Sequence, residues 1–435
     1  MSVDQCTTSV ADVSFADNTY RKVAWRLVPL LFVCYVLAYL DRVNVGFAKL
    51  QMLNDLQFSE AVYGLGAGIF FIGYFFFEVP TNLMLYRIGA RKVITRIMIT
   101  WGILSALTMF VETSTQFYVI RFLLGISEAG FFPGIIYYLT IWFPAHRRGQ
   151  ITALFMTAIP MAGVIGGPLS GWILATFAGV NGWAGWQWLF LLEGLPTVCV
   201  GLFVWFHLDD GIQSAKWLTP TEKTFLADSI KQDGPVSATH SFRHALSNPK
   251  VWILCVVYFG LIMGLYGIGF WLPTLIKSSG VTDAINVGFL SAIPYLCAVV
   301  SMILVSRSAD QRRERRWHFA IPALLGAVGL MLSVPFASNT TFAIASLSLA
   351  CAGIITALPL FWSYPTAFMG GAAAAGGIAL VGSVGNLAGF VSPYMIGLIK
   401  DLTQKTDVGV YVLAAWVVAS AVIVLTCLPA RLVNR

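Results

Sequence analysis

Long apolar runs separated by short polar segments make up most of this 435-residue chain. A helix needs about 20 apolar residues to cross the hydrocarbon core of a bilayer. These runs are too long and too uniformly apolar for the strands of a membrane barrel, in which apolar and polar residues alternate. The pattern therefore predicts an all-α integral membrane protein with twelve transmembrane helices. We expect them at residues 25–46, 62–86, 93–111, 117–139, 150–176, 186–206, 251–276, 284–306, 319–336, 341–369, 374–399 and 409–429.

One longer polar segment, residues 207–250, divides the runs into six and six. It is too short and polar for a folded domain, so it is interpreted as a linker between an N-terminal six-helix half (1–206) and a C-terminal six-helix half (251–435). Within the linker, Thr219 and Glu222 have the spacing of a capping box, which predicts that a short surface helix follows.

The composition excludes most soluble classes. Hydrophobic residues make up 58% of the chain and charged residues 11%, against about 25% charged in an ordinary soluble domain. A soluble enzyme, a nucleic-acid binder and a disordered protein are therefore all disfavoured. The first 24 residues are polar, so no cleavable signal peptide is expected.

The net charge of +7 does not indicate a nucleic-acid partner. Of the 23 basic residues in loops and tails, nineteen lie on the side that holds both termini and the linker, and the loops of the other side hold only Lys49, Lys277, Lys400 and Lys405. Basic loops stay in the cytoplasm, which predicts a multi-pass protein of the cytoplasmic (inner) membrane with both termini inside.

The chain lacks the motifs of common catalytic and cofactor sites. The seven cysteines form no CxxC pair, and no Walker, HExxH or GxSxG motif with partners occurs. We therefore expect no enzyme activity, no catalytic residue, no metal and no cofactor. The expected partners are lipid, protons and a small molecule, and the protein is expected to be a monomer.

Ionisable residues within the apolar runs are the candidates for function, because a charge in a bilayer is costly. Asp41 and Arg42 lie in the first run, where adjacent residues point about 100° apart. Tyr35 and Tyr39 fall on the Arg42 side, at i−7 and i−3. Two phenols and a guanidinium on one face suit an oxyanion, while Asp41 faces elsewhere; the alternative is a structural salt bridge.

A second pair lies on the fourth run, where Arg121 and Glu128 are almost two helical turns apart and share a face. A buried glutamate tends to be neutral and can carry a proton, and arginine can bind a carboxylate with two parallel hydrogen bonds. Glu78 and Glu193 also lie in apolar runs, but a structural role is the better interpretation of each.

The second half carries no ionisable Asp, Glu, Arg or Lys away from the ends of its runs. It offers polar and aromatic side chains that could shape a substrate site, although each aromatic taken singly is more typical of packing. They are Trp362, Ser363, Tyr364, Asn386, Tyr258, Tyr266 and Trp271.

The organisation resembles the major facilitator superfamily. Residues 82–92 are similar to its G-x-L-x-D-R-x-G-x-R signature, with Asn82 in place of the usual glycine and Tyr86 in place of the usual aspartate. Within that superfamily, the chain is similar to the anion:cation symporter family at Tyr39–Arg42, Glu78–Leu83 and the segment from Arg121 to Gly134. Four further segments match that family as well: Gly185–Trp188, Glu193–Gly194, Trp217–Thr219 and Asn248–Trp252.

Members of that family carry tartrate, phthalate, aldonates and similar organic acids, mostly with protons. The resemblance implies that Arg42 and Arg121 hold the substrate carboxylate and that Asp41 and Glu128 handle protons. It also implies that Tyr74 and Asn386 contact the substrate. With Tyr39 and Trp362, these residues form the predicted site.

The predicted function is proton-coupled symport of a small organic carboxylate by alternating access. An organic anion antiporter remains open as the nearest alternative, followed by a receptor or sensor with a transporter fold. The sequence does not choose between an aromatic acid and a hydroxy acid as the substrate.

Overall fold

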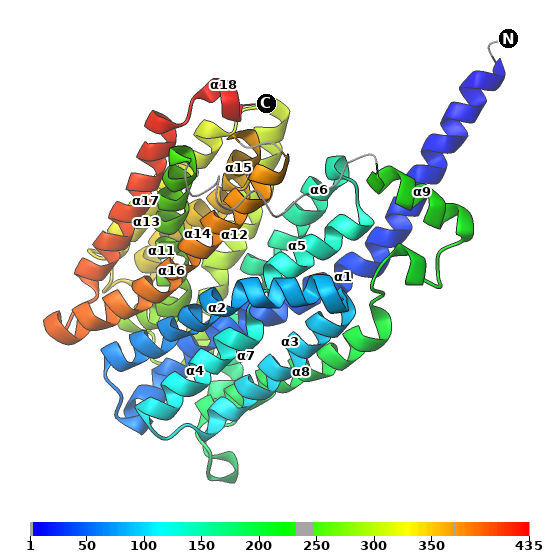
Figure 1. Cartoon of the computed structure of the whole chain (residues 1–435). Helices are drawn as coiled ribbons and strands as arrows, with labels where there is room; N and C mark the ends of the chain where they lie inside the picture. The colour runs from blue at the N-terminus through cyan, green and yellow to red at the C-terminus, as the bar shows by residue number, and fades with distance from the viewer. Residues whose placement is uncertain (1–2, 232–247, 369–370, 435) are drawn as a thin grey trace.

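The computed structural model describes residues 3–231, 248–368 and 371–434 (Figure 1). The regular elements of these ranges are all helical, and twelve candidate spans are long and apolar enough to cross a membrane. The predicted class and number of spans are therefore confirmed. Residues 232–247 of the expected linker lie outside the described ranges.

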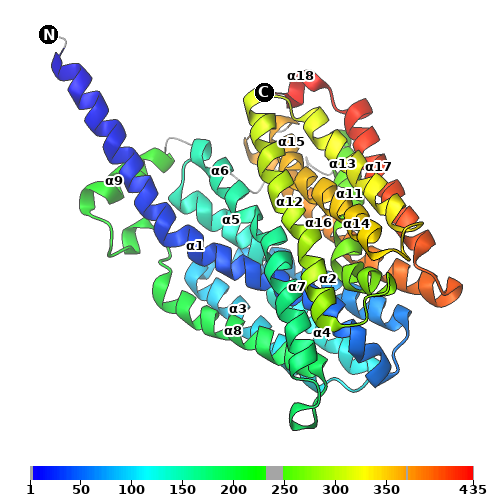
Figure 2. The same cartoon turned by 180° about the vertical axis from the view of Figure 1, so that it is seen from behind.

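The helices up to residue 207 form a first helix group, and those from 249 to 427 form a second (Figures 1 and 2). The first comprises α1 (Val3–Leu56), α2 (Glu60–Ile88), α3 (Ala90–Leu107), α4 (Ser114–Glu128), α5 (Phe131–Trp142), α6 (Ala145–Met156), α7 (Ala158–Thr176) and α8 (Gly185–His207). The second comprises α11 (Pro249–Ser278), α12 (Ala284–Arg312), α13 (Arg316–Ser333), α14 (Thr340–Phe361), α15 (Ser363–Phe368), α16 (Gly371–Thr403) and α17 (Asp407–Cys427). Two short helices lie outside the groups, α9 (Pro220–Lys231) and α18 (Ala430–Val433).

Polar caps mark where many of these helices begin, because the first amide groups of a helix have no partner within it. Thr113 and Gln116 form a capping box at the start of α4. Asn248 accepts a hydrogen bond from the amide of Lys250 at the start of α11. The predicted capping box of Thr219 and Glu222 is also present, with distances of 2.8 and 3.3 Å, and it starts α9.

Three of the predicted spans are interrupted helices. The fourth breaks between α4 and α5, the fifth between α6 and α7, and the tenth between α14 and α15. Gly130 causes the first of these breaks with a φ of 81°, in the left-handed region that favours glycine. A Cβ at Gly130 would also lie 2.9 Å from the Cβ of Thr81. Irregular backbone at membrane depth is tolerated where protein buries it.

Both termini lie at one end of the bundle, which we call the terminal end (Figures 1 and 2). The opposite end, which we call the loop end, holds the connections after α1, α3, α7, α11, α13 and α16. Since every span reverses direction, the N-terminal parts of α2 and α12 and the C-terminal parts of α7 and α16 lie at the loop end.

The two helix groups touch closely through glycines at the loop end. A Cβ on Gly64 in α2 would lie 2.4 Å from the carbonyl oxygen of Pro393 in α16. A Cβ on Gly288 in α12 would lie equally close, at 2.4 Å, to the carbonyl oxygen of Gly167 in α7. Small residues let helix backbones approach closely in membranes, so the sequence brings the two groups together at this end.

The connection between α2 and α3 contains the signature-like segment. Tyr86, which replaces the usual aspartate, is exposed and packs edge-on against Tyr137, with ring centroids 6.0 Å apart. Arg91 instead contacts Asp210, which accepts its backbone amide at 2.9 Å and lies 3.7 Å from its guanidinium. The carboxylate of Asp210, which follows α8 in the sequence, therefore lies at the N-terminal end of α3, where negative charge is favoured.

Candidate transport site

A buried ion pair lies between α1 and α4. The Nη2 atom of Arg42 contacts the Oε1 atom of Glu128, and both side chains are almost fully buried. Asp41, the sequence neighbour of Arg42, points away from this pair. Removing one partner of a buried pair typically costs about 3–5 kcal/mol, because the other charge remains buried. The sequence placed these two residues on separate helices of one site, but it did not predict that they would be partners.

Aromatic rings surround the guanidinium of Arg42. Its Cζ atom lies 5.2 Å from the ring centroid of Tyr39, 5.3 Å from that of Phe70 and 5.7 Å from that of Tyr74. These are cation–π distances. Tyr39 and Tyr74 therefore lie beside Arg42, as the predicted site requires. Tyr35 instead stacks on Phe155, with centroids 4.4 Å apart.

The second helix group also reaches Arg42. Tyr266 in α11 accepts a hydrogen bond from Arg42 Nη1 at 2.8 Å. Its ring packs against Phe71 at 4.4 Å and against Phe270 at 5.8 Å. Tyr266 is one of the aromatic residues of the second half that the sequence does not assign to the site, because nothing in the pattern distinguishes it from packing residues.

Arg121 is fully buried on α4 but pairs with backbone rather than with a carboxylate. It donates hydrogen bonds to the carbonyl oxygens of Gly66 at 3.3 Å and Ala67 at 3.5 Å in α2. Its Cζ atom lies 5.2 Å from the centroid of the Phe70 ring, which also contacts Arg42. One aromatic ring therefore contacts both buried guanidinium groups.

Asp41 lies in a different polar cluster. It accepts hydrogen bonds from Ser105 in α3 at 2.8 Å and from Thr197 in α8 at 3.1 Å. Asn44, one turn further along α1, donates to it at 3.3 Å. The structure thus separates the predicted proton-handling pair, since Glu128 contacts Arg42 while Asp41 faces α3 and α8.

Trp362 and Asn386, the two predicted site residues of the second group, contact other polar and aromatic residues. Trp362 lies at the break between α14 and α15 and packs edge-on against Tyr258, with centroids 4.9 Å apart. Asn386 in α16 lies beside the carboxyl group of Glu78, which also accepts a 3.4 Å hydrogen bond from Ser383. Glu78, interpreted from the sequence as structural, therefore joins α2 to α16.

The prediction that Lys49 lies in a loop is wrong. Helix α1 continues to Leu56, so Lys49 is helical and only 4% exposed. Its Nζ atom lies 2.6 Å from Glu60 in α2 and 3.3 Å from the centroid of the Trp271 ring in α11. Lys49 was misplaced because the polar residues around it ended the apolar run on which the prediction was based.

Glu60 is the centre of a charged cluster at the loop end. It also pairs with Lys400 in α16 at 2.5 Å. Asp401 accepts the backbone amides of Glu60 at 3.1 Å and Ala61 at 2.8 Å, capping α2 from the other helix group. We call Lys49, Glu60, Lys400 and Asp401 the loop-end cluster. It joins the two helix groups.

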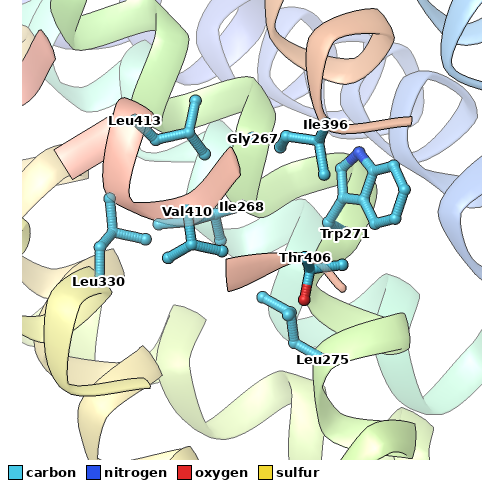
Figure 3. Close-up of a pocket in the computed structure, with 9 residues that line it drawn as sticks. All are labelled: Gly267, Ile268, Trp271, Leu275, Leu330, Ile396, Thr406, Val410 and Leu413. Atoms are coloured by element: carbon cyan, nitrogen blue, oxygen red, sulfur yellow. The ribbon is translucent and has the colours of Figure 1, made fainter. Parts of the chain in front are cut away.

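A small cavity lies beside Trp271, within the second helix group (Figure 3). Its volume is about 10 Å³, roughly enough for one water molecule. Its lining is almost entirely apolar, with Leu413, Val410 and Leu330 among the lining residues. The cavity is too small and too apolar for a carboxylate, so the candidate site remains at Arg42.

Comparison with known families identifies the class of protein. A sequence model described as the Major Facilitator Superfamily matches residues 31–393. The chain belongs to this superfamily. The predicted recognition is thus confirmed, and because members of this superfamily are membrane transporters, so is the expectation that the protein is not an enzyme. It is a secondary transporter.

Several superfamily relatives are similar over nearly their whole length. A Pseudomonas putida protein named as a metabolite transport protein, NicT, is 49% identical, with 100% of each chain covered. An Agrobacterium vitis protein named as a tartrate transporter is 48% identical, covering 93% of this chain and 90% of its own. An Acinetobacter baumannii protein named as a quinolone resistance transporter is 40% identical, with 92% and 93% covered.

Solved structures of the superfamily share the fold. A D-xylose-proton symporter aligns with a TM-score of 0.74 at 15% identity, covering 93% of this chain and 98% of that one. A bacterial homologue of the human lysosomal transporter Spinster, in an inward-facing and unoccupied conformation, aligns with a TM-score of 0.68 at 18% identity. That alignment covers 95% of this chain and 96% of the other.

Proposed function

We propose that this transporter carries a small organic carboxylate into the cell together with protons, by alternating access across the inner membrane. The observation that carries the proposal is the buried contact between Arg42 and Glu128. Arg42 is the cation best placed to bind an anion, and in this contact it binds the protein's own carboxylate, that of Glu128.

The pairing suggests how substrate and proton binding are coupled. A substrate carboxylate that binds Arg42 takes the place of Glu128. The displaced Glu128 is fully buried, and an unpaired buried charge is costly, so it is neutralised by a proton. Substrate and proton then bind in the same step and are carried in the same direction. This order of events favours symport over antiport.

The surroundings of Arg42 support a carboxylate as the substrate class. Arginine binds carboxylates through two parallel hydrogen bonds, and Arg121 adds a second buried guanidinium across the Phe70 ring. In the proposed site, Tyr39, Tyr74 and Tyr266 offer hydroxyl groups near Arg42, while Trp362 and Asn386 line it from the second group. The tartrate transporter name of the relative at 48% identity agrees with this class.

The charge balance also favours proton coupling. Moving one negative charge into a cell that is negative inside costs about 2.3 kcal/mol per 100 mV. One proton cancels the charge of a monoanion, and two are needed for a dianion. A carrier that protonates its own glutamate on binding the anion avoids this cost.

The proposed orientation places the loop end outside the cell. The basic residues concentrate at the terminal end, and basic loops face the cytoplasm. The two helix groups touch at this end through glycines and the loop-end cluster, so in the proposed orientation the transporter is closed to the outside.

The test is transport by purified protein in liposomes. A thermal-shift screen against carboxylic acids first identifies a ligand, which is then supplied with and without a pH gradient, acidic outside. Wild type should accumulate it only with the gradient. Glu128→Gln mimics the protonated form, so it should exchange internal for external substrate but lose gradient-driven accumulation.

Three results would contradict the proposal. Normal gradient-driven accumulation by Glu128→Gln would remove this residue from proton coupling. Uptake that requires an internal counter-substrate, whatever the pH gradient, would make the protein an antiporter. Binding without accumulation would instead indicate a receptor.

A further inference from the structure

Three of the four lysines on the loop-end side gather where α1 meets α11 and α16. The Nζ atom of Lys49 in α1 lies 3.3 Å from the centroid of the Trp271 ring, and that of Lys400 in α16 lies 5.6 Å from the same ring. Lys277 in α11 donates a hydrogen bond at 3.3 Å to the carbonyl oxygen of Leu50, the residue after Lys49. The loop end therefore carries a local concentration of positive charge.

Two of these lysines, Lys277 and Lys400, are accessible to solvent, and we call them the outer lysines. Lys277 is exposed and the Lys400 side chain is 25% exposed, whereas Lys49 is only 4% exposed. Both outer lysines belong to the second helix group, and each contacts the first. Lys277 contacts the Leu50 carbonyl of α1, and Lys400 pairs with Glu60 of α2 at 2.5 Å. An anion that arrives at the loop end meets these two ammonium groups first.

The lysines outnumber the carboxylates that are paired with them. Glu60 divides its two oxygens between two lysines, with Oε1 at 2.5 Å from Lys400 and Oε2 at 2.6 Å from Lys49. Both carboxyl oxygens of Asp401 already accept backbone amides at the start of α2. Among the residues that the structure describes, no carboxylate oxygen lies within 4.0 Å of the Lys277 ammonium group. The charge of Lys277 therefore has no acidic partner there.

The outer lysines lie on the outer side of the proposed binding residue, along the same two helices. Arg42 in α1 contacts Tyr266 in α11 at 2.8 Å. Leu50 follows Arg42 by eight residues, which is about 12 Å along the helix axis, and Lys277 follows Tyr266 by eleven, which is about 16 Å. Helices α1 and α11 thus meet both at Arg42 and at the outer lysines. Separating them at the loop end opens a route from the outer lysines toward Arg42.

We propose that Lys277 and Lys400 form an outer site that captures the carboxylate of the incoming substrate before it reaches Arg42. Glu60 shows the class of ligand that suits Lys400, because its own carboxylate is the partner there. The inference rests on the proposed function, from which it takes the substrate class and the orientation. It adds a binding step at two residues that the proposed function does not use.

Capture at the outer site also releases contacts between the helix groups. Lys277 exchanges a neutral carbonyl for a carboxylate, and a hydrogen bond between two charged groups is the stronger one. When Lys400 binds the substrate, Glu60 keeps Lys49 as a partner within the first group, so no buried charge loses its partner. The outer lysines are free of the first group only when the groups separate. The anion therefore binds the open state better and shifts the equilibrium toward it.

The first test is uptake into liposomes of the carboxylate that the thermal-shift screen selects. Lys277→Gln combined with Lys400→Gln should lower kcat/KM of uptake about threefold to tenfold, since one exposed ion pair is worth up to about fivefold in affinity. The corresponding double Arg variant keeps both charges and should stay near wild type. Lys405→Gln, at an exposed lysine of the same side, is the matched control and should also match wild type.

A purely structural role of the outer lysines predicts the opposite sign. Losing two contacts that close the loop end would raise the population of the outward-open state and with it kcat/KM of uptake. An increase or no change in the double Gln variant would therefore overturn the proposal. A protein that accumulates no carboxylate at all would contradict the proposed function instead. Normal accumulation with unchanged kcat/KM in the double Gln variant would contradict only the outer site.

Spin labels at Asn54 and Gln404 separate the outer site from the binding residue. In an Arg42→Ala background, the same carboxylate should still increase the share of long distances between the labels. Adding Lys277→Gln and Lys400→Gln should abolish this response. Sodium chloride at equal ionic strength should not reproduce it. An equal response to chloride would mean that salt merely screens the pair of Lys400 and Glu60, and it would overturn the carboxylate site.

Discussion

Tyr266 in α11 accepts a hydrogen bond from Arg42 in α1, with its hydroxyl oxygen 2.8 Å from Nη1. The bond crosses from one helix group to the other, at the residue that also contacts Glu128. Arg42 is therefore oriented by both groups at once. A conformational change that separates α1 from α11 must break this bond, so it connects the proposed binding residue to the movement that transport requires.

Tyr266→Phe should weaken substrate binding about tenfold or more. The ring contacts with Phe71 and Phe270 are kept, and a hydrogen bond to a charged group is lost, which is worth about 1.5–3 kcal/mol. Calorimetry with the identified carboxylate measures the change. Tyr295→Phe, at a buried tyrosine that packs against Gly163, is the matched control. An affinity within about threefold of wild type would show that the bond is absent when substrate is bound.

Arg42→Ala and Arg121→Ala should each reduce substrate affinity by roughly 30-fold to several thousand-fold. Truncating one partner of a buried charged pair costs about 2–5 kcal/mol, at about 1.4 kcal/mol per tenfold change. The Lys variants should rescue poorly, because an ammonium group cannot form two parallel hydrogen bonds. If both Ala variants bind within about threefold of wild type, the carboxylate is held elsewhere.

The ion pair of Arg42 and Glu128 provides a control for the arginine substitutions. Arg42→Ala leaves Glu128 buried without its partner, which destabilises the protein by about 3–5 kcal/mol if Glu128 stays charged. Combining it with Glu128→Gln should recover most of the unfolding temperature and none of the substrate affinity. Recovery of affinity in the double variant would mean that Arg42 only neutralises Glu128.

Glu60→Gln should loosen the loop end. It removes the negative partner of both Lys49 and Lys400 and leaves Lys49 buried. Spin labels at the exposed positions Asn54 and Gln404 report the separation of the helix groups there. Wild type should show mainly a short distance, and Glu60→Gln a larger share of long distances. Glu112→Gln, at an exposed carboxylate of the same end, should match wild type; if Glu60→Gln also matches it, the cluster does not hold this end closed.

The orientation can be measured with single cysteines in a background without the seven native ones. A cysteine at Gln404 should react with a membrane-impermeant maleimide in intact cells. One at Gln213 should react only after permeabilisation, because the linker is expected in the cytoplasm. Labelling of Gln213 from outside would reverse the proposed direction of every span.

The fold was predictable from the sequence because each span needs only an apolar run of sufficient length. The helix breaks were not, since the break after Glu128 depends on how Gly130 packs against Thr81. Candidate site residues were recognisable because Arg42, Arg121, Asp41 and Glu128 are charges in apolar surroundings. Their partners were not, because helix periodicity gives the direction of a side chain relative to its own helix and not the rotation of one helix against another.

Tyr266 and Asn44 illustrate this limit. Neither is an acidic or basic residue, so neither is conspicuous in an apolar run. Each becomes informative only through an atom on another residue: Arg42 Nη1 for the tyrosine and Asp41 Oδ1 for the asparagine. Lys49 shows the opposite case, in which a conspicuous charge was assigned to a loop because helix α1 extends beyond its apolar stretch.

The contact between Arg42 and Glu128 also has an electrical consequence. A carrier that returns empty with a bare arginine would move a positive charge through the membrane field on every cycle. Here the vacant binding residue carries its own counter-ion, so the field does no work on this pair during the return. In the proposed cycle, the Arg42–Glu128 pair therefore adds no voltage dependence to the empty return. In the loaded step, its contribution is set by the difference between the charge of the substrate and the number of protons bound with it.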